Sequence, residues 1–325
     1  MSSIGMERER ASRQVGFKQI LVGTDFSEPS RRALAYALLL ARQYDSQIRV
    51  LHVVSPEPRQ PIPLDPLPRE LNRQQLLAKA EVQKLEQENG LREARHTIEV
   101  VAGKVSEVIS SIIDRDHSDL LVLGTRGRGG LKKLALGSVA EQAVRLASCP
   151  VLTVGPRVAS PKPDAIFKSI LFATDFGAAS TRAFPLALRL AEEYGAKLAL
   201  IHLLPPVSFA DIGAGGYGAA AYAEKDLAAW HERLGEEGVQ KLKALIPSDA
   251  RLASEPLYIV ETHFLPDGIL EAAAVQHSDL IVMGANQTWS SRVAAHLPWA
   301  VLHEVMCEVR CPVLTVREQA TARIT

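Results

Sequence analysis

The chain has 325 residues, with 37 basic and 37 acidic side chains and 47% hydrophobic residues. The balanced charge excludes a global field that would draw the protein to nucleic acid or anionic lipid, and no apolar run reaches the roughly 20 residues that span a bilayer. The length suits two domains of ordinary size. Three cysteines without metal or disulfide spacing fit a reducing compartment, so we expect a cytoplasmic protein without nucleic-acid or membrane partners.

The first half of the chain alternates predicted strands and helices. The predicted strands are residues 18–24, 47–54, 96–102, 119–124 and 151–154. The predicted helices are residues 27–44, 70–89, 105–116 and 138–147. Ser27 is the expected N-cap of the first helix, with Pro29 in its first turn, and the six prolines of residues 55–69 exclude regular structure there.

The second half repeats the first. Residues 20–26 return as 170–176, 117–124 as 277–284, and 149–154 as 311–316, at offsets of 150, 160 and 162 residues. The predicted strands are residues 168–174, 197–204, 256–261, 279–283 and 313–316, and the predicted helices are residues 180–194, 222–245, 266–276 and 299–308. Mostly apolar strands separated by helices predict an α/β fold of two repeated, doubly wound domains with parallel sheets.

These patterns also predict the domain boundaries. We expect a polar tail at residues 1–16, a first domain at 17–155, a proline-containing linker at 156–165, a second domain at 166–317 and a short tail at 318–325. The first tail lacks the apolar core of a signal peptide. Duplication of a whole domain is therefore the expected organisation.

A glycine-rich, basic loop joins the predicted strand 119–124 to the predicted helix 138–147. Glycines let main-chain N–H groups approach phosphate oxygens, and a helix N-terminus adds unpaired donors and the positive end of its dipole. The positive side chains of the loop are Arg126, Arg128, Lys132 and Lys133. Ser138 could equally cap the helix, with Glu141 as its capping-box partner. The segment predicts a phosphate site, and hence a bound nucleotide.

Each half resembles a universal stress protein domain, and the resemblance covers nearly the whole chain. It rests on residues 24–27 and 51–53 and most of all on the ATP-binding pattern of that family: glycine, two residues, glycine, nine residues, glycine, then serine or threonine. The residues that fit this spacing are Gly124, Gly127, Gly137 and Ser138. The resemblance implies an adenine-nucleotide alpha-hydrolase-like fold with a mainly five-stranded parallel sheet in each domain. It also implies ATP, with or without Mg²⁺, as the ligand.

The resemblance further implies which residues bind ATP. They are Thr24, Asp25, Val53, Gly124, Arg126, Gly127, Arg128, Gly137, Ser138 and Val139. It places Asp25 against adenine, the main chain of Val53 at the adenine edge, and the loop glycines with the Val139 N–H at the phosphates. The residues alone leave alternatives open: Asp25 as a turn or cap residue, Val53 as an ordinary strand residue, and the two arginines as solvated loop side chains.

The second half departs from this pattern. It keeps Asp175 and Gly284, but Trp299 and Ala300 stand where the last glycine and the serine belong, after an insertion of two residues. Pro298 and Trp299 would crowd a phosphate. We expect a degenerate second site marked by Asp175 and Gly284; the alternative is a loop re-routed around a different ligand.

No residue receives a catalytic assignment. His52 and His202 occupy equivalent strand positions, where a histidine is more often a hydrogen-bonded core residue than a base. His117 and His277 each precede a strand and are expected at helix ends. No Ser-His-Asp triad, paired carboxylates or metal-ligand cluster can be identified. We therefore expect no metal site of the protein's own.

Three functional classes remain open. The first, which we favour, is an ATP-binding sensor or regulator of a stress response, in which nucleotide occupancy changes the loop around residues 125–137 and a partner surface. The second is a slow ATPase or autophosphorylating enzyme, with Ser138 or Thr125 as acceptor. The third is a nucleotide-free interaction scaffold, which the altered second loop would suit.

The resemblance also bears on assembly. In that family, domains pair through their last strands, which implies that residues 151–154 lie beside residues 313–316 within one chain. The result would be a monomer with a pseudo-two-fold axis. A homodimer of such tandem chains is left open.

Overall fold

The computed structural model describes residues 16–55, 67–88, 90–125, 136–161, 167–204, 219–285 and 298–318. The strands are β1 (Gln19–Gly23), β2 (Gln47–Val54), β3 (His96–Ala102), β4 (Leu120–Gly124), β5 (Val151–Val154), β6 (Ser169–Ala173), β7 (Lys197–Leu204), β8 (Leu257–Thr262), β9 (Leu280–Ala285) and β10 (Val313–Arg317). The helices are α2 (Glu28–Tyr44), α3 (Leu67–Glu88), the 3₁₀ turn η1 (Leu91–Glu93), α4 (Val105–Asp116), α5 (Ser138–Leu146), α6 (Ala178–Tyr194), α7 (Ala219–Leu245), α8 (Leu265–Val275) and α9 (Pro298–Glu308).

The expected alternation of strands and helices is confirmed, with shifts at the ends of several elements. The largest corrections are at the starts of α3 and α7, which begin at Leu67 rather than residue 70 and at Ala219 rather than residue 222. Pro68 lies in the first turn of α3, where a missing N–H removes no helical bond. The turn η1 was not predicted. Residues 56–66 of the proline-rich segment lie outside the described residues.

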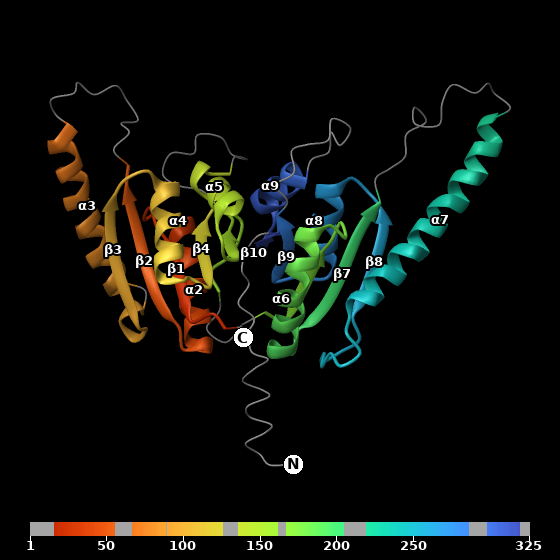
Figure 1. Ribbon diagram of the computed structural model, residues 1–325, viewed down its shortest axis with the longest axis horizontal. Helices are drawn as coiled ribbons and strands as arrows, with labels where there is room; N and C mark the ends of the chain where they lie inside the picture. Colours follow the sequence, from red (N-terminus) through yellow and green to blue (C-terminus); the bar gives the residue numbers. More distant parts are fainter. Residues whose placement is uncertain are drawn as a thin grey trace, which may run out of the picture.

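The strands of both halves form a ten-stranded sheet in the order β3-β2-β1-β4-β5-β10-β9-β6-β7-β8 (Figure 1). Pairing is parallel within each half, as the doubly wound prediction requires. In each half the first strand lies between the second and the fourth, so the strand order reverses direction there. Crevices at such reversals, at the carboxyl ends of the strands, are where open α/β sheets bind ligands.

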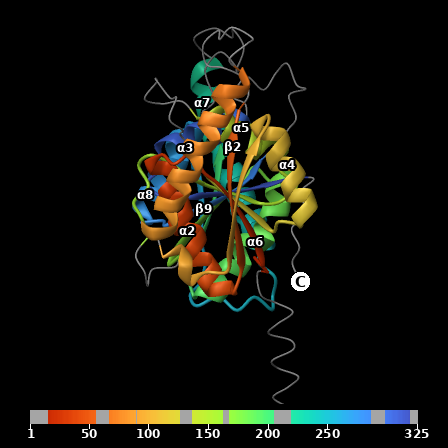
Figure 2. The same ribbon diagram turned by 90° about the vertical axis from the view of Figure 1, so that its left-hand side faces the viewer.

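Two buried apolar clusters lie on opposite faces of this sheet. Side chains alternate along each strand, so that Ile20 and Val22 join the cluster with α2, α3, α6 and α7, whereas Leu21 joins the cluster with α4, α5, α8 and α9. From the side of the first domain, α2 and α3 lie on one side of the sheet and α4 on the other (Figure 2). Both clusters contain residues of both halves, so each apolar layer is continuous across the molecule.

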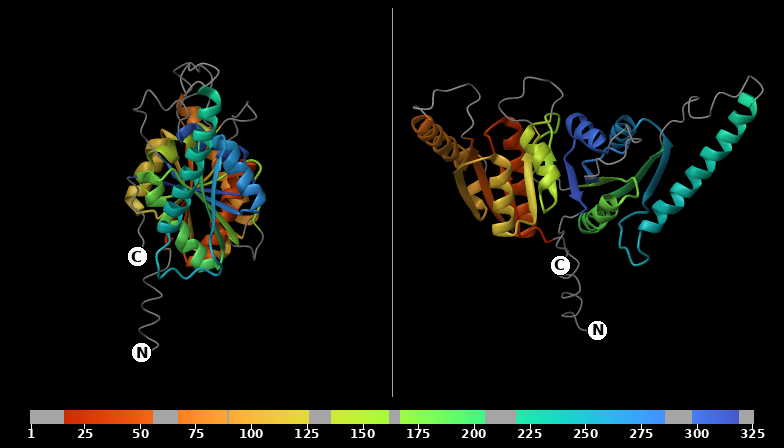
Figure 3. Two further views of the ribbon diagram at one scale, coloured as in Figure 1. Left: turned by 90° about the vertical axis from the view of Figure 1, so that its right-hand side faces the viewer. Right: turned by 45° about the horizontal axis from the view of Figure 1, so that its top comes forward.

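β5 and β10 join the two halves as an antiparallel pair. Val313 lies opposite Thr153, and Thr315 lies opposite Val151. The two threonine hydroxyls donate reciprocally: Thr153 Oγ1 to Val313 O at 3.1 Å, and Thr315 Oγ1 to Val151 O at 3.2 Å. These equivalent contacts relate the halves by a pseudo-two-fold axis, with α5 and α9 side by side near the middle of the sheet (Figures 1 and 3).

A tyrosine pair marks the same axis on the other face of the sheet. Tyr44 OH donates to Glu193 Oε2 at 2.6 Å, and Tyr194 OH donates to Tyr44 OH at 2.8 Å. Burial raises the pKa of both phenols above the ordinary value of 10, so both hydroxyls remain protonated donors at neutral pH.

Among the helices that the structure describes, none has the combination of length and hydrophobicity that a membrane span requires.

Candidate functional site

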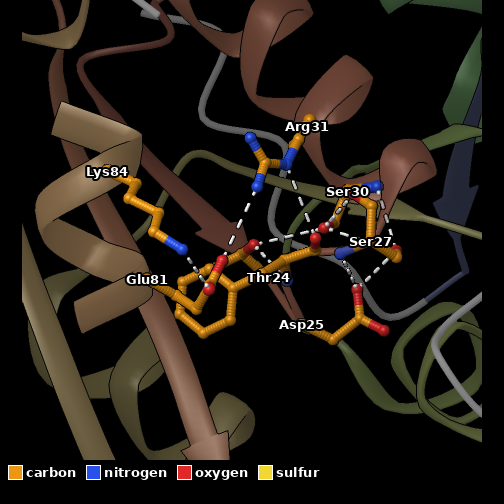
Figure 4. Close-up of polar contacts among 8 residues, drawn as sticks. Thr24, Asp25, Ser27, Ser30, Arg31, Glu81 and Lys84 are labelled. Atoms are coloured by element: carbon orange, nitrogen blue, oxygen red, sulfur yellow. Dashed lines mark hydrogen bonds and ion pairs between the residues drawn. The ribbon is translucent and has the colours of Figure 1, made fainter. Parts of the chain in front are cut away.

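The candidate site lies at the carboxyl ends of β1, β2 and β4, beside the first turn of α5. The β1–α2 turn forms one side of it (Figure 4). Phe26 adopts a left-handed backbone conformation, with φ of 62°, and its N–H donates to Thr24 Oγ1 at 3.0 Å. Because non-glycine residues adopt this conformation at a cost, the turn must be held by its surroundings. The Thr24 hydroxyl is part of that support, and its side chain is buried.

Asp25 also holds this turn. Its Oδ1 accepts from Ser27 N at 3.1 Å and from Ser27 Oγ at 2.5 Å. Ser27 is the N-cap of α2, as predicted, and its side chain accepts from Ser30 N. The interpretation of Asp25 as a turn and cap residue therefore has a direct basis in these contacts. A contact with adenine stays a prediction.

His52, on β2, has a structural role beside the end of β1. Its Nδ1 lies 2.8 Å from Thr24 O, and its ring packs on that of Phe26 with centroids 4.6 Å apart. Because a carbonyl oxygen only accepts, Nδ1 carries the proton. The expected hydrogen bond of this histidine is confirmed in both halves, since His202 Nδ1 makes the same 2.8 Å contact with Thr174 O.

Val53 lies where β2 continues beyond β1. The last residue pair between these strands is Gly23 with Leu51, and Thr24 N still donates to Leu51 O at 2.9 Å. Val53 follows two residues later and pairs with Val101 of β3 on the other side. At Val53, β2 has therefore passed the end of its pairing with β1. This position suits the main-chain contact with a ligand that the resemblance implies.

A cluster of charged side chains from α2 and α3 adjoins the turn (Figure 4). Arg31 Nε donates to Phe26 O at 3.5 Å, and Arg31 Nη2 lies 3.6 Å from Glu81 Oε2. Lys84 Nζ lies 3.1 Å from Glu81 Oε1. Sequence reasoning did not identify these residues, because only the spacing of Glu81 and Lys84 on one helix is visible in the sequence.

The first turn of α5 is the part of the candidate site where the sequence predicts phosphate binding. Glu141 N donates to Gly137 O at 3.0 Å, which is the first bond of the helical pattern. The N–H groups of Ser138, Val139 and Ala140 therefore precede that pattern and are the donors that an anion at a helix N-terminus uses. The Gly137 N–H has a different role, because it donates to Thr125 O at 2.7 Å and closes the base of the loop.

The capping box predicted for Ser138 is wrong. The N-cap is Gly137, without a side-chain hydrogen bond, and Ser138 is the first helical residue. Glu141 does not reach back to a cap but pairs with Arg145 at 3.3 Å. The Ser138 side chain is exposed rather than used by the helix.

Gly124 is explained by packing. A Cβ added to Gly124 would lie 2.8 Å from Pro29 C and from Ser30 N, at the start of α2. A Cβ on Gly284 would collide with Ala179 and Ser180 at the start of α6 in the same way. This close approach of strand and helix is common to both halves, so packing alone accounts for the first glycine of the motif in each half.

The charged and glycine residues of the predicted phosphate loop lie between Thr125 and Leu136. Arg126, Gly127, Arg128, Lys132 and Lys133 lie outside the described residues. Their roles therefore remain those that the sequence predicts.

The second half repeats the turn but not the helix start. Asp175 is exposed, and its Oδ1 accepts from Gly177 N at 2.9 Å and from Ser180 Oγ at 2.6 Å. α9 begins at Pro298, two residues before the position that corresponds to Ser138. Proline has no N–H, so the first position of α9 offers no donor. Residues 286–297, which follow Gly284, lie outside the described residues.

The remaining candidate side chains lie at helix ends or in the buried core. His117 is the C-cap of α4, and His277 directly follows Gln276, the C-cap of α8, as expected. No cysteine is in a disulfide, and burial raises the pKa of Cys149 and Cys311 to about 12. Within the described parts of the chain, no group of three or more His, Cys, Asp or Glu side chains could hold a metal ion.

Comparison with known proteins identifies similar sequences and a similar fold. A model of the universal stress protein family matches residues 16–155 and again residues 166–317. The universal stress protein MJ0531 of Methanocaldococcus jannaschii is 33% identical over 142 residues, which are 42% of this chain and 82% of that protein. A universal stress protein of Thermus aquaticus is 33% identical over 141 residues, 42% of this chain and 98% of that protein. A solved universal stress protein of Archaeoglobus fulgidus has the same fold, with a TM-score of 0.61 at 20% identity over 94% of this chain and 98% of that one.

Proposed function

The chain belongs to the universal stress protein family, with two domains of that family in tandem, and from this premise we propose that it is an ATP-dependent regulator of a stress response. ATP, with or without Mg²⁺, binds in the first domain, between the β1–α2 turn and the first turn of α5. The observation that carries this proposal is the set of N–H groups of Ser138, Val139 and Ala140, which precede the helical pattern of α5 at the end of the phosphate loop.

The phosphates bind at the start of α5. The proposed phosphate residues are Gly124, Arg126, Gly127, Arg128, Gly137, Ser138 and Val139. Among them, Gly137 closes the loop base and Gly124 permits the close packing of β4 on α2, so both act by shaping the loop. The direct donors are the first-turn N–H groups of α5, with the loop arginines beside them.

The nucleoside binds at the carboxyl ends of β1 and β2. Val53 supports this placement because its strand edge lies past the end of the β1 ladder. Thr24 and Asp25 hold the turn whose main chain forms the adjacent wall. In the second domain the corresponding turn around Asp175 is kept, whereas the helix start is altered beyond Gly284. We therefore propose one ATP site per chain.

Regulation by binding fits these residues better than rapid turnover. Bound ATP supplies a triphosphate anion that draws helix donors and loop arginines to one place, so that occupancy alone sets the loop conformation. Slow autophosphorylation is the second candidate, because the Ser138 hydroxyl is exposed and does not cap α5. Thr125, the other nominated acceptor, has an exposed fraction of only 1% and is a poor one.

We further propose that the two domains remain paired through β5 and β10 in solution, and that the protein acts in the cytoplasm. The reciprocal threonine bonds and the two continuous apolar clusters support the pairing. Homodimerisation of the tandem chain stays open and is read from the mass of the native protein.

The test separates the first N–H of α5 from the Ser138 hydroxyl. Ser138→Pro deletes the first N–H of α5 and the hydroxyl, and Ser138→Ala deletes the hydroxyl alone. Proline fits this first helical position, and the extended conformation of Gly137 (φ −65°, ψ 140°) suits a residue that precedes proline. We expect Ser138→Pro to weaken ATP binding at least about tenfold, the cost of a hydrogen bond to a charged group, and Ser138→Ala to change it much less. Isothermal titration with ATP and Mg²⁺ measures both.

Native mass spectrometry of the full chain completes this test. One ATP mass per chain, lost in Gly127→Asp, is the expected result. Two ATP masses would show a working second site. If the folded wild-type protein binds no ATP at millimolar concentration, the interaction-scaffold reading replaces this proposal.

A further inference from the structure

We propose that the second domain positions the nucleotide loop of the first, through a hydrogen bond from the main chain of Leu136 to the side chain of His303 on α9. Leu136 directly precedes Gly137, the N-cap of α5, so it lies just before the proposed donor turn. The effect on ATP binding rests on the proposed function. The contact itself does not.

The contact joins residues that are 167 positions apart in the chain. Leu136 N–H donates to His303 Nε2 at 3.3 Å. Because an N–H only donates, Nε2 must be the unprotonated nitrogen, which requires a neutral imidazole with its proton at Nδ1. Leu136 is buried, with 7% of its surface exposed, and belongs to the same apolar cluster as Val301, Leu302 and Val305 of α9.

The other end of the loop stands on the same interface. Thr125 N donates to Val154 O of β5 at 3.0 Å, and Thr125 O accepts from Gly137 N at 2.7 Å. Directly after β5, a Cβ added to Gly155 would lie 2.8 Å from Met306 O of α9. Both ends of the loop are thus fixed where α9 of the second domain packs against the first.

The equivalent hydrogen bond from the second half to the first cannot form. The offset of 162 residues that relates Cys149 to Cys311 also relates Leu136 to Pro298 and Glu141 to His303. Proline has no N–H to donate, and Glu141 pairs instead with Arg145 within its own helix. The residues that differ between the halves therefore leave a support for the first loop without an equivalent support for the second.

Holding Leu136 favours nucleotide binding by reducing the entropy lost when the donor turn at the start of α5 is fixed around the phosphates. The first proposed donor, Ser138 N–H, lies two residues beyond Leu136, so fixing Leu136 fixes the start of the donor turn. A loop that is already anchored loses less conformational freedom on binding. His303 is accordingly a positioning residue, which acts on the nucleotide through the main chain of the loop.

The experiment compares two substitutions in the full chain. His303→Leu removes the acceptor and introduces an apolar side chain of similar size, whereas His303→Gln retains an acceptor oxygen on a side chain of suitable length. We expect ATP binding to weaken about three- to tenfold in His303→Leu, the usual effect of one neutral hydrogen bond, and to stay within about twofold in His303→Gln. Isothermal titration gives both affinities.

Two controls separate this role from a general loosening of the domain pair. Glu304→Gln changes the exposed neighbour of His303 on α9. Thr315→Val deletes the bond from Thr315 Oγ1 to Val151 O, between the domains but on the β5–β10 ladder. Neither variant should change the ATP affinity. If Thr315→Val weakens ATP binding as much as His303→Leu, the specific positioning role is overturned.

Amide hydrogen exchange at Leu136, measured without nucleotide, tests the contact directly. We expect faster exchange in His303→Leu than in the wild type, and recovery in His303→Gln. Unchanged exchange would overturn the inference. A wild type that binds no ATP, with Leu136 exchange that still responds to His303, would overturn the proposed function and leave the contact standing.

Discussion

At the scale of single residues, the first glycine of the phosphate motif has two explanations that make different predictions. In a nucleotide site, Gly124 would lack a side chain so that the backbone can approach a phosphate. In the fold, it lacks one because α2 begins 2.8 Å from the position of its Cβ. Gly284 keeps the same packing beside an altered loop, which favours packing as the main constraint.

Gly124→Ala and Gly284→Ala should each lower the free energy of unfolding by about 1–3 kcal/mol, because the added methyl group meets backbone atoms that cannot move away easily. Gly235→Ala is the matched control: it lies in α7, nothing lies within 4 Å of its added Cβ, and it should stabilise by about 0.5–1 kcal/mol. Urea denaturation measures all three. A stable Gly124→Ala that no longer binds ATP would instead support close phosphate approach.

The candidate site could be predicted from the sequence only in part. Asp25 and Val53 lie at strand ends because residue order along β1 and β2 places them there. The cap of α5 was predicted wrongly, since Ser138 and Gly137 both suit a helix start and local sequence does not decide between them. Arg31 with Glu81, and Leu136 with His303, could not be predicted, because these contacts join elements that only the tertiary fold brings together.

At the scale of elements, the apolar runs predict the strands well because both faces of the sheet are covered. The predicted boundaries of elements are wrong where a local sequence rule has an exception. Pro68 is tolerated in the first turn of α3, so the helix starts earlier than a proline-rich segment suggests. The turn η1 contains the fully buried Leu91, and its stability comes from tertiary packing rather than from a local signal.

β2, β3 and α4 are also linked by an ion-pair network. Arg49 contacts both Glu99 and Asp116, and Arg115 lies 3.0 Å from Glu99 and 2.8 Å from Asp116. Hydrogen bonds from Arg115, with further attraction from Arg49, hold the pKa of both carboxyl groups below their ordinary values of 4.5 and 3.8. The network therefore stabilises the fold in the carboxylate form.

Arg115→Met should make the stability of the protein less sensitive to acid pH. A lowered pKa in the folded state gives a contribution that is complete above the unfolded value and is lost as the pH falls through the folded value. The wild-type melting temperature should thus fall more steeply between about pH 5 and pH 3 than that of Arg115→Met. Calorimetry across this range measures the slopes, and parallel curves would contradict the prediction. Lys104→Met, at the exposed start of α4, is the control.

At the scale of the whole molecule, the hydrogen bonds of Tyr44 and Tyr194 join the two halves. Tyr44 makes two hydrogen bonds across the pseudo-two-fold axis, one to Glu193 and one from Tyr194, whereas Tyr194 OH donates only the bond to Tyr44. Tyr44→Phe also leaves the Glu193 carboxylate without this donor. The two substitutions are therefore unequal although the positions are equivalent.

We expect Tyr44→Phe to lower the free energy of unfolding by about 1–3 kcal/mol and Tyr194→Phe by about 1 kcal/mol. Tyr36→Phe, on the same helix but bonded at 3.3 Å to Ala159 O in the segment that follows β5, should have a smaller effect than either. Thermal unfolding of the full chain compares the three. Equal effects of Tyr44→Phe and Tyr194→Phe would show that the Glu193 bond contributes little.

The antiparallel pairing of β5 with β10 inside one polypeptide has a consequence for how this protein can evolve. Where two identical subunits meet at a two-fold axis, every substitution occurs on both sides at once, and a change that helps one side must be tolerated by the other. Here the two sides are separate stretches of one gene. Pro298 and His303 could replace their counterparts while Leu136 and Glu141 stayed as they were. Selection was thereby free to change the residues of one half without changing those of the other.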